Sequence, residues 1–504
     1  MSTSKGVINI LQEFSIPLIV GVLAAVVFAN LDQHSYHAIV EYGPLDALCA
    51  NSDGHGTFCQ APHGAHDATD SEVGHEHSHD GDAHEGDPHA PAAHDDAAAG
   101  HSTDAEPDNT DEAAAAAAAI AGEPNDLRAP DHGTIKPVFS LFGHHLTLHF
   151  LINDIFMLFF FGVAAKEITE SVLPGGDLNP PSKAINPLLA TIGGVVGPVG
   201  CYLLLTYALY GGADAATFEA VRNGWGIPTA TDIALAWLIA RIVFGGSHPA
   251  VNFLLLLAIA DDAIGLGIIA IFYPNPDHPV APQYLLMVVA GMGVAFALRK
   301  KGVQNWVPYI AIGGTLSWLG LLNAALHPAL ALVPIVPFLP GPKTDTGLFR
   351  DDDEADLNDP THASHDHAHS PLHNFEHSIK LFVDFGLFFF GFANAGVEFS
   401  AISDVTWIVL ASLIVGKTVG ITFFAMVGSM LGFKLPEGMS IRHVVVAGLV
   451  AGVGLTVALF VAGEAFPGGS PHQGPAKMGA LLSFFSGVLA IIVGRIVKAN
   501  ELDK

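Results

Sequence analysis

Apolar residues along this chain fall into runs of about 20, separated by stretches rich in charged residues, glycine and proline. A helix of about 20 residues is long enough to cross the hydrocarbon core of a bilayer. The pattern therefore predicts an all-α polytopic membrane protein with about twelve transmembrane helices. The predicted spans are residues 9–30, 146–170, 184–210, 225–244, 250–273, 282–298, 305–322, 324–340, 374–396, 404–431, 441–464 and 476–497.

Basic residues between the spans indicate the orientation. An even number of spans puts both termini on one side, and most lysines and arginines fall on that side. The positive-inside rule then predicts that both termini are cytoplasmic. The N-terminal side carries Lys5, Lys183, Arg241, Arg299, Lys300, Lys301, Lys343, Arg350, Lys434, Arg495, Lys498 and Lys504, and the opposite side carries Arg128, Lys136, Arg222 and Lys477.

Two long polar segments interrupt the hydrophobic pattern. Residues 51–132 hold 19 acidic residues, 11 histidines and one arginine, and residues 351–369 hold seven acidic residues and no lysine or arginine. They account for −25 of the formal charge of −29, so the membrane part is nearly balanced and we expect no nucleic-acid partner. A composition this polar cannot bury a core, so we expect the segments to be mostly disordered.

The chain is therefore expected to have five parts. These are a first transmembrane helix (1–40), an extracytoplasmic, periplasmic loop rich in His, Asp and Ala (41–135), membrane helices 2–8 (136–345), a cytoplasmic loop rich in His and Asp (346–371) and membrane helices 9–12 (372–504). Cys49 and Cys59 flank a short polar stretch in the first loop. A disulfide between them requires that this loop lie outside the reducing cytosol.

The span at 250–273 contains two adjacent aspartates, Asp261 and Asp262, in "LAIADDAIGLG". Each ionised aspartate at the centre of a span costs about 2.5–3.5 kcal/mol, so the two must face protein or water rather than lipid. Neighbouring carboxylates in a low-dielectric site need a neutralising charge, and either a proton or a small hard cation such as Na⁺ can supply it on the same oxygens. The two ligands then exclude each other, which is the minimum requirement for exchange.

Two spans are predicted to be discontinuous. In the fourth, "GWGIPTATD" places two glycines and Pro228 before Thr231 and Asp232, and in the eleventh three glycines precede Thr456. An unwound segment in a membrane frees carbonyls that need local partners or a bound ion. The fourth and eleventh spans are seven apart in the order, so they cross the membrane in opposite directions. This predicts that spans 3–5 and 10–12 form an inverted repeat that crosses at mid-membrane. Lys417, central in the tenth span, needs a buried anion, which the two aspartates offer.

Other functions fit these residues less well. The open alternative is a divalent-metal/proton exporter fed by the histidine-rich loops. It predicts His, Cys or Met ligands inside the spans, whereas the central positions named above carry Asp, Thr and Lys. An intramembrane aspartyl protease would place its two acids on separate helices, whereas these two are adjacent. A purely structural role does not explain a lysine at the centre of a span. The residues favour a secondary transporter, not an enzyme.

Seven motifs follow one another in an order that resembles the NhaA family of bacterial sodium/proton antiporters. They are "LINDIFMLFFFGVAAKE", "GWGIPTATDIALA", "LLLAIADDAIGLGIIAIFY", "FANAGV", "GKTVGI", "LPEG" and "AGLVAGVGLTVALFVA". The resemblance extends from Leu151 to Val497 and leaves out the two polar loops. It implies an NhaA-like fold of twelve helices with crossed, broken helices 4 and 11, in the bacterial inner membrane.

The resemblance also implies roles for individual residues. Asp261 and Asp262 would hold Na⁺, and Lys417 would pair with the first of them. The implied ion-binding set is Asp261, Asp262, Asp232, Thr231 and Lys417, and the implied set at the mouth and in the pH sensor is Asp154, Glu376 and His377. It further implies electrogenic, pH-regulated exchange of Na⁺ or Li⁺ for a larger number of protons, no resident cofactor, contact with lipid, and a homodimer.

The chain departs from the family pattern near the implied pH sensor. Ala164 stands where the family often has an acid, with Glu167 and Glu170 close by. Lys380 replaces a second histidine, and Asp384 is an additional acid in the ninth span. The family's pH range therefore does not carry over to this chain.

Overall fold

The computed structural model describes residues 16–41, 140–141, 144–145, 147–173, 181–274, 279–341 and 370–502. All of them belong to one compact unit, which lies within Met1–Leu48 and Phe139–Lys504. The loop predicted at 41–135 lies outside the described residues except for its first residue, and the loop at 346–371 except for its last two. Cys49 and Cys59 also lie outside them, so the disulfide stays a prediction.

The described part of the chain is helical, apart from one antiparallel pair of two-residue strands, β1 (Ser140–Leu141) and β2 (His144–His145). Among the described residues, six segments are long and apolar enough to cross a membrane, and two bent helix pairs raise the number to as many as eight. A multi-pass membrane protein is thereby confirmed, while the count of twelve spans stays a prediction. The six segments comprise α6 (Leu148–Phe150), a π-helical turn (Leu151–Phe156) and α7 (Met157–Val172); α8 (Pro181–Tyr210); α11 (Pro249–Phe272); a 3₁₀ turn (Pro282–Tyr284) and α12 (Leu285–Lys300); α16 (Asp404–Ala411), a π-helical turn (Ser412–Gly416) and α17 (Lys417–Met430); and α20 (Gln473–Leu482) with α21 (Phe484–Ile496).

Both spans predicted to be discontinuous are bent. In the first, α9 (Ala215–Arg222) and a 3₁₀ segment (Asn223–Thr229) meet α10 (Ile233–Phe244) at 53°. In the second, α18 (Ile441–Ala451) meets α19 (Leu455–Ala465) at 51°. The breaks follow from the sequence, because proline lacks an N–H to continue a helix and glycine loses more backbone entropy there than other residues.

Four other predicted spans are shorter or less apolar. α2 (Ile16–Leu31), α13 (Thr315–Asn323) after a π-helical turn (Tyr309–Gly314), and α15 (Pro371–Asn394) correspond to 9–30, 305–322 and 374–396. The span predicted at 324–340 is a shorter apolar helical segment, Pro328–Phe338, made of two 3₁₀ parts, Pro328–Leu332 and Val336–Phe338, so a full span there stays a prediction. Prolines at 328, 334 and 337 remove N–H donors from any helix there. The remaining described elements are α3 (Gln33–Glu41) and a 3₁₀ turn (Phe399–Ala401).

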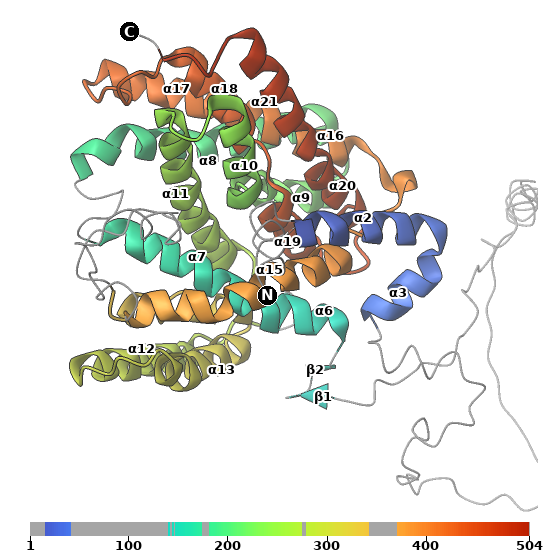
Figure 1. Cartoon of the computed structure of the whole chain (residues 1–504). Helices are drawn as coiled ribbons and strands as arrows, with labels where there is room; N and C mark the ends of the chain where they lie inside the picture. Colours follow the sequence, from blue (N-terminus) through green and yellow to red (C-terminus); the bar gives the residue numbers. More distant parts are fainter. Residues whose placement is uncertain are drawn as a thin grey trace, which may run out of the picture. The chain divides into compact units, whose positions relative to one another are not determined.

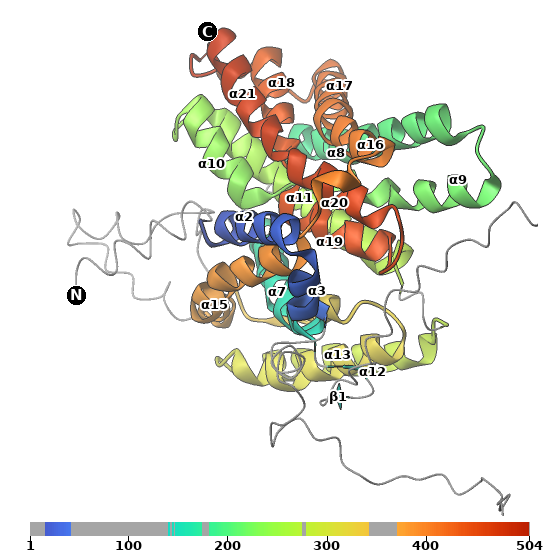
Figure 2. The same cartoon turned by 90° about the vertical axis from the view of Figure 1, so that its right-hand side faces the viewer.

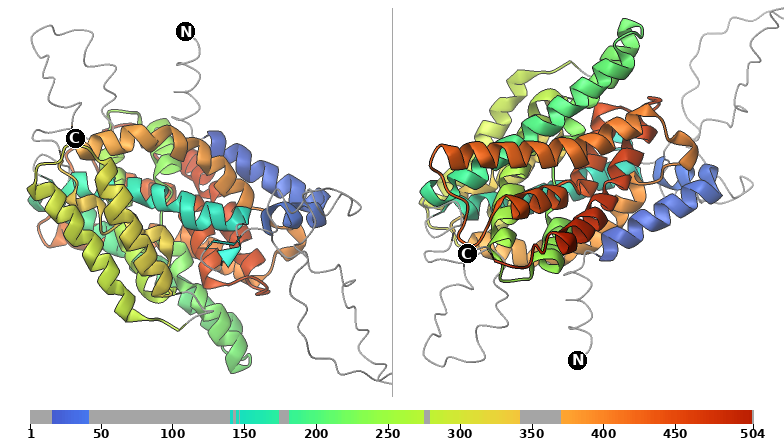
Figure 3. Two further views of the ribbon diagram at one scale, coloured as in Figure 1. Left: turned by 90° about the horizontal axis from the view of Figure 1, so that it is seen from below. Right: turned by 90° about the horizontal axis from the view of Figure 1, so that it is seen from above.

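The helices enclose α11. Figures 1 and 2 show α12 and α13 along one side of this unit and α8, α17 and α18 on the opposite side, with α11 between them. Figure 3 shows the yellow α12 and α13 nearest the viewer from below, and orange and red helices of the C-terminal third nearest from above. Of the six apolar segments, α11 is the most deeply buried. The helix that carries the two adjacent aspartates is therefore more buried than the other five of these segments.

Glycines bring α8 and α17 into backbone contact. A Cβ atom built at Gly193 would lie 2.1 Å from the carbonyl oxygen of Gly420, and one at Gly197 would lie 2.3 Å from that of Gly416. Small residues four positions apart allow such close approach between membrane helices. This contact fixes the position of Lys417, which begins α17 directly after Gly416.

Candidate ion-binding site

Asp261 lies at the centre of a buried polar cluster. Its Oδ2 atom is 2.6 Å from the Lys417 ammonium nitrogen, and both side chains are fully buried. The Thr231 hydroxyl donates to the same oxygen at 2.8 Å, and the Lys417 ammonium also donates to the carbonyl oxygen of Thr229 at 2.8 Å. The other oxygen, Oδ1, has no hydrogen-bond partner in the structure. One carboxylate oxygen of Asp261 therefore accepts from two donors, and the other, also buried, accepts from none.

Asp262 follows Asp261 on α11. Its side chain is buried, and its Oδ1 atom has no hydrogen-bond partner. It lines a small cavity together with aromatic and aliphatic side chains, namely Phe160, Phe161, Ala164, Leu266 and Val457. A buried carboxylate with an unsatisfied oxygen is costly unless a proton or a cation neutralises it.

Asp232 joins the two breaks. Its Oδ1 atom accepts from the Leu235 N–H at 3.0 Å, which caps the N-terminus of α10. Its Oδ2 atom accepts from the Thr456 hydroxyl at 3.0 Å and from the Thr456 N–H at 3.3 Å, at the N-terminus of α19. The Asp232 N–H donates to the Val453 carbonyl oxygen at 2.8 Å. One carboxylate therefore faces the positive ends of two half-helices, where a negative charge is favoured.

The three acids and the lysine leave the cluster with two uncompensated negative charges if all are ionised. Lys417 neutralises Asp261, and the two helix N-termini favour charge on Asp232. The Asp262 carboxylate is bound neither to the lysine nor to a helix N-terminus, and its Oδ1 atom has no hydrogen-bond partner. It is therefore the carboxylate that most needs a proton or cation. Chemically, the cluster can bind protons and a small hard cation on shared oxygens.

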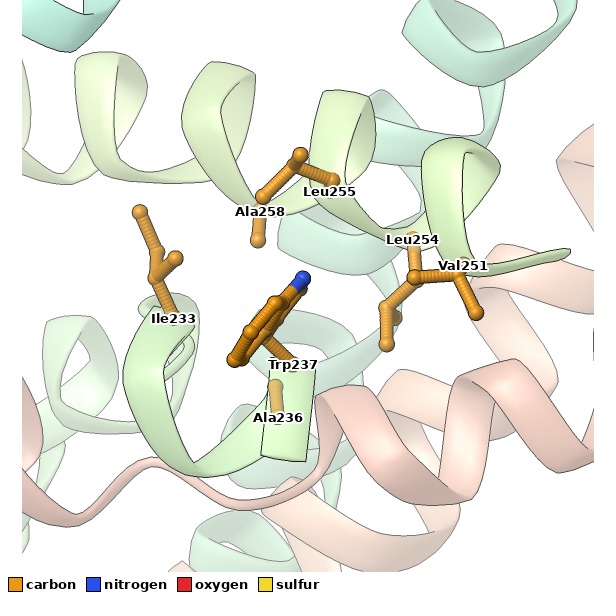
Figure 4. A pocket seen from close by; sticks show the side chains of 7 residues that line it. All are labelled: Ile233, Ala236, Trp237, Val251, Leu254, Leu255 and Ala258. Carbon is orange, nitrogen blue, oxygen red and sulfur yellow. The ribbon is translucent and has the colours of Figure 1, made fainter. Parts of the chain in front are cut away.

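A second, apolar pocket beside the acids contributes no ionisable group. It lies between α10 and α11 and is lined by Ile233, Ala236, Trp237, Val251, Leu254, Leu255 and Ala258 (Figure 4). The Trp237 indole supplies the one polar side-chain atom in that lining. Its lining offers no oxygen ligand for a cation.

Asp154 lies away from the acids of α11, in the π-helical turn that precedes α7. The Trp318 indole N–H donates to its backbone carbonyl oxygen at 3.4 Å. Its carboxylate interacts electrostatically with His327 and Glu464, which form an ion pair with 3.0 Å between Nε2 and Oε1. Sequence reasoning missed Glu464, because an acid one turn from the end of a span ordinarily reaches water.

Glu376 lies in another charged cluster, between α7 and α15. It forms an ion pair with Lys166, which also lies 2.7 Å from Glu170 and 3.4 Å from Glu167. His377 is exposed, and its ring centroid is 6.4 Å from that of His373, one turn earlier on α15. Sequence reasoning noted the acids but missed Lys166, although a lysine with an acid four residues later on an apolar helix was the available signal.

Within the described residues, no group of three or more His, Cys, Asp or Glu side chains is placed to hold a metal ion. The histidine-rich loops on which the metal-exporter alternative rests lie outside those residues. The described site chemistry is therefore that of oxygen ligands and one ammonium group.

Known proteins similar to this chain share one description. Residues 115–495 match the family described as Na⁺/H⁺ antiporter 1. The Na⁺/H⁺ antiporter NhaA 1 of Pelobacter propionicus is 56% identical over 356 residues, which cover 71% of this chain and 88% of that protein. The NhaA antiporter of Geobacter sulfurreducens is 56% identical over 359 residues, with the same coverage of 71% and 88%.

One relative matches along the whole length. The Na⁺/H⁺ antiporter NhaA of Desulfitobacterium hafniense is 45% identical over 505 aligned positions, which cover 100% of this chain and 99% of that protein. The similarity in this case includes the segments that hold the two polar loops.

Proposed function

This chain belongs to the NhaA family of Na⁺/H⁺ antiporters, and from that premise we propose that it exports Na⁺ or Li⁺ electrogenically in exchange for H⁺. The transporter would work in the bacterial inner membrane with both termini in the cytoplasm. Protons and the alkali cation would compete for Asp261 and Asp262. Membrane lipid, Na⁺, Li⁺ and H⁺ are then its partners, with no resident cofactor, and we expect a homodimer.

The observation that carries the proposal is the unequal treatment of two adjacent buried acids. Asp261 is bound to Lys417 and Thr231, whereas Asp262 faces a cavity with an oxygen that lacks a partner. A proton and Na⁺ would bind the same Asp262 carboxylate, so binding of one displaces the other. This competition couples Na⁺ transport to H⁺ transport. A carboxylate without a proton or cation is too costly in a low-dielectric interior, so one ion leaves only when the other binds.

The two bent helix pairs support alternating access. The breaks are in direct contact: the Asp232 N–H donates to the Val453 carbonyl oxygen, and the Thr231 hydroxyl oxygen lies 3.1 Å from the Ala451 carbonyl oxygen. We propose that these breaks are the crossing point of inverted repeats built on predicted spans 3–5 and 10–12. Half-helices that end at a mid-membrane site can tilt on either side of it and expose it to one compartment at a time.

We also propose regulation by pH and an access route through charged clusters at the ends of the helices. Glu376 and His377 would belong to the pH sensor, and the network of Lys166 with Glu376, Glu170 and Glu167 gives that end of α7 and α15 several groups whose charge can change. Asp154 would lie on the route by which cations reach the site.

Substitution of Asp262 tests the proposal. The purified chain and the Asp262→Asn variant would be reconstituted in proteoliposomes with an imposed pH gradient reported by acridine orange. Na⁺ or Li⁺ should dissipate the gradient in the unchanged protein and fail to do so in the variant, because asparagine neither ionises nor exchanges a proton. Asp214→Asn is the matched control, since Asp214 is an exposed helix cap before α9, and it should retain exchange.

Two results would contradict the proposal. One is a gradient that Zn²⁺ dissipates and Na⁺ does not, which would establish the divalent-metal exporter instead. The other is calorimetry of the detergent-solubilised protein that shows Na⁺ binding without release of any proton at any pH, since competition at shared oxygens requires that release.

A further inference from the structure

Two buried histidines face each other at the ends of the helices that carry the site. His248 precedes α11, and His443 lies in the first turn of α18, the helix that leads to the second break. Their ring centroids are 4.9 Å apart, and the ring of Phe244 at the end of α10 stacks on His248. Both side chains are buried, with exposed fractions of 6% and 0%. Figures 1 and 2 show α10, α18 and α21 gathered in this region.

Hydrogen bonds require both rings to be uncharged in this structure. The Ala250 N–H donates to Nδ1 of His248 at 3.1 Å, which caps α11. The Ser440 N–H donates to Nδ1 of His443 at 2.9 Å, which closes a capping box at the start of α18. A ring nitrogen that accepts a hydrogen bond carries no proton, and an imidazolium has no acceptor. In His443 the proton must then lie on Nε2, which donates to the Glu501 carbonyl oxygen at 3.1 Å.

We propose that His248 and His443 are positioning residues that hold α11 and α18 together only while both rings are neutral, and so set the acid limit of exchange. The inference rests on the proposed function, because it concerns when the site on α11 is competent. It adds a pH-responsive element separate from Glu376 and His377, which lie on α15.

Protonation would oppose the packing in three ways. Each ring would lose the lone pair that accepts the capping N–H, two positive charges would face each other across 4.9 Å, and each charge would lie at a helix N-terminus, where the helix dipole repels it. The contact is therefore stable where histidine is neutral and weakens as pH falls through the range in which histidine titrates.

Among the described residues, most of the charged side chains on the elements around the two histidines are positive. Arg442 is bound to the carbonyl oxygens of Val497 and Glu501, so the C-terminal segment is attached beside His443 by a further positive group. Within the part of the chain that the structure describes, these charged side chains are Arg241 at the end of α10, Lys434 and Glu437 before α18, Arg442 on α18, Arg495 on α21, and Lys498 and Glu501 after it, and two of these seven groups are acids. Most of them are positive, which adds to the repulsion of an imidazolium.

The test replaces both rings with side chains that cap without titrating. Asparagine is a favoured N-cap residue and glutamine suits the last position of a capping box, so His248→Asn combined with His443→Gln keeps both caps. Exchange at saturating Na⁺ would be measured in proteoliposomes across pH. We expect unchanged activity at alkaline pH and an acid limit shifted downward by about one pH unit, equivalent to a tenfold change in proton concentration. The control His472→Gln removes an imidazole that lies between α19 and α20 and should leave the profile in place.

A third variant separates a pH effect from a structural one. His443→Ala removes the cap at every pH, so its exchange should be reduced at alkaline pH, and His443→Gln should restore it. An unmoved acid limit in an active double variant would overturn the inference while leaving the antiporter intact. Absence of Na⁺-driven exchange from the unchanged protein at alkaline pH would instead overturn the proposed function.

Discussion

Adjacent residues on one helix acquire different chemistry at this site. Successive side chains on an α-helix point about 100° apart, so Asp261 and Asp262 cannot share the same partners. Asp261 points to Lys417 and Thr231, and Asp262 points to a cavity lined by residues of α7, α11 and α19. The two adjacent aspartates thus differ: the Asp261 carboxylate is held by a lysine, and the Asp262 carboxylate remains available to an ion.

Removal of the Lys417 ammonium should destabilise the protein in a pH-dependent way. In Lys417→Met, Asp261 keeps its burial but loses its cation, and breaking a buried ion pair costs about 3–5 kcal/mol. A proton or Na⁺ can replace the ammonium, so the loss of thermal stability in detergent should be largest at alkaline pH without Na⁺ and smaller at low pH or with Na⁺ added. Lys301→Met, at an exposed position after α12, should unfold like the unchanged protein. A destabilisation that is the same at every pH and Na⁺ concentration would show that Lys417 only fills space.

The residues that could be found from the sequence are those isolated in the middle of an apolar run. Asp261, Asp262 and Lys417 stand out because a charge at those positions cannot reach water. For the same reason the sequence predicted that Lys417 pairs with a buried anion. Glu464 and Lys166 are not isolated in this way, because each lies where a side chain can ordinarily extend to the membrane surface, and the signal for Lys166 was the acid four residues later. Their burial depends on which helices pack nearby, and that information is not local to either sequence motif.

At the scale of elements, glycine and proline decided what could be predicted. They correctly predicted that two spans are interrupted, and the structure bends these spans by 53° and 51°. At 324–340, where hydropathy predicts a span, four prolines limit the helical structure to two short 3₁₀ segments. Hydropathy measures the preference of a segment for lipid and carries no information about its backbone hydrogen bonds.

Contact between α8 and α17 should depend on single glycines. Gly193→Ala would place a Cβ atom 2.1 Å from the Gly420 carbonyl oxygen, so the two helices would have to separate and move Lys417. We expect a lower unfolding temperature and weaker Na⁺-driven exchange in proteoliposomes. Gly200→Ala on the same helix meets no atom within 4 Å, and it should be neutral or slightly stabilising, because alanine favours a helix by about 0.5–1 kcal/mol. Equal behaviour of the two variants would mean that α8 and α17 do not depend on this close contact.

At the scale of the whole molecule, charge is separated by location. The two polar loops carry nearly all of the net charge, whereas the membrane part is close to balanced and keeps its few buried ions in local clusters. The positive-inside pattern and the number of apolar runs could be taken from sequence because both depend on composition alone. The packing of α11 between its neighbours could not, because apolar helices differ little in composition whether they face lipid or protein.

The buried charge of the site leads to a prediction about voltage. Asp232, Asp261 and Asp262 with Lys417 sum to a charge of −2, so the site is neutral with two protons bound and −1 with a single Na⁺. A cycle that exchanges two protons for one Na⁺ therefore carries one net charge across the membrane. Each charge moved through 100 mV is worth about 2.3 kcal/mol, which corresponds to a roughly 50-fold change in the Na⁺ gradient that the transporter can sustain.

Proteoliposomes loaded with ²²Na⁺ allow a direct measurement. An inside-negative potential set by valinomycin and a K⁺ gradient should draw protons inward and accelerate ²²Na⁺ efflux, and a potential of opposite sign should slow it. The Asp262→Asn variant should show neither response, which controls for leakage through the lipid. Equal efflux at both potentials would mean that the charges exchanged are equal. In that case a single proton would leave for each Na⁺ bound, and only one of the two adjacent aspartates would take part in the exchange.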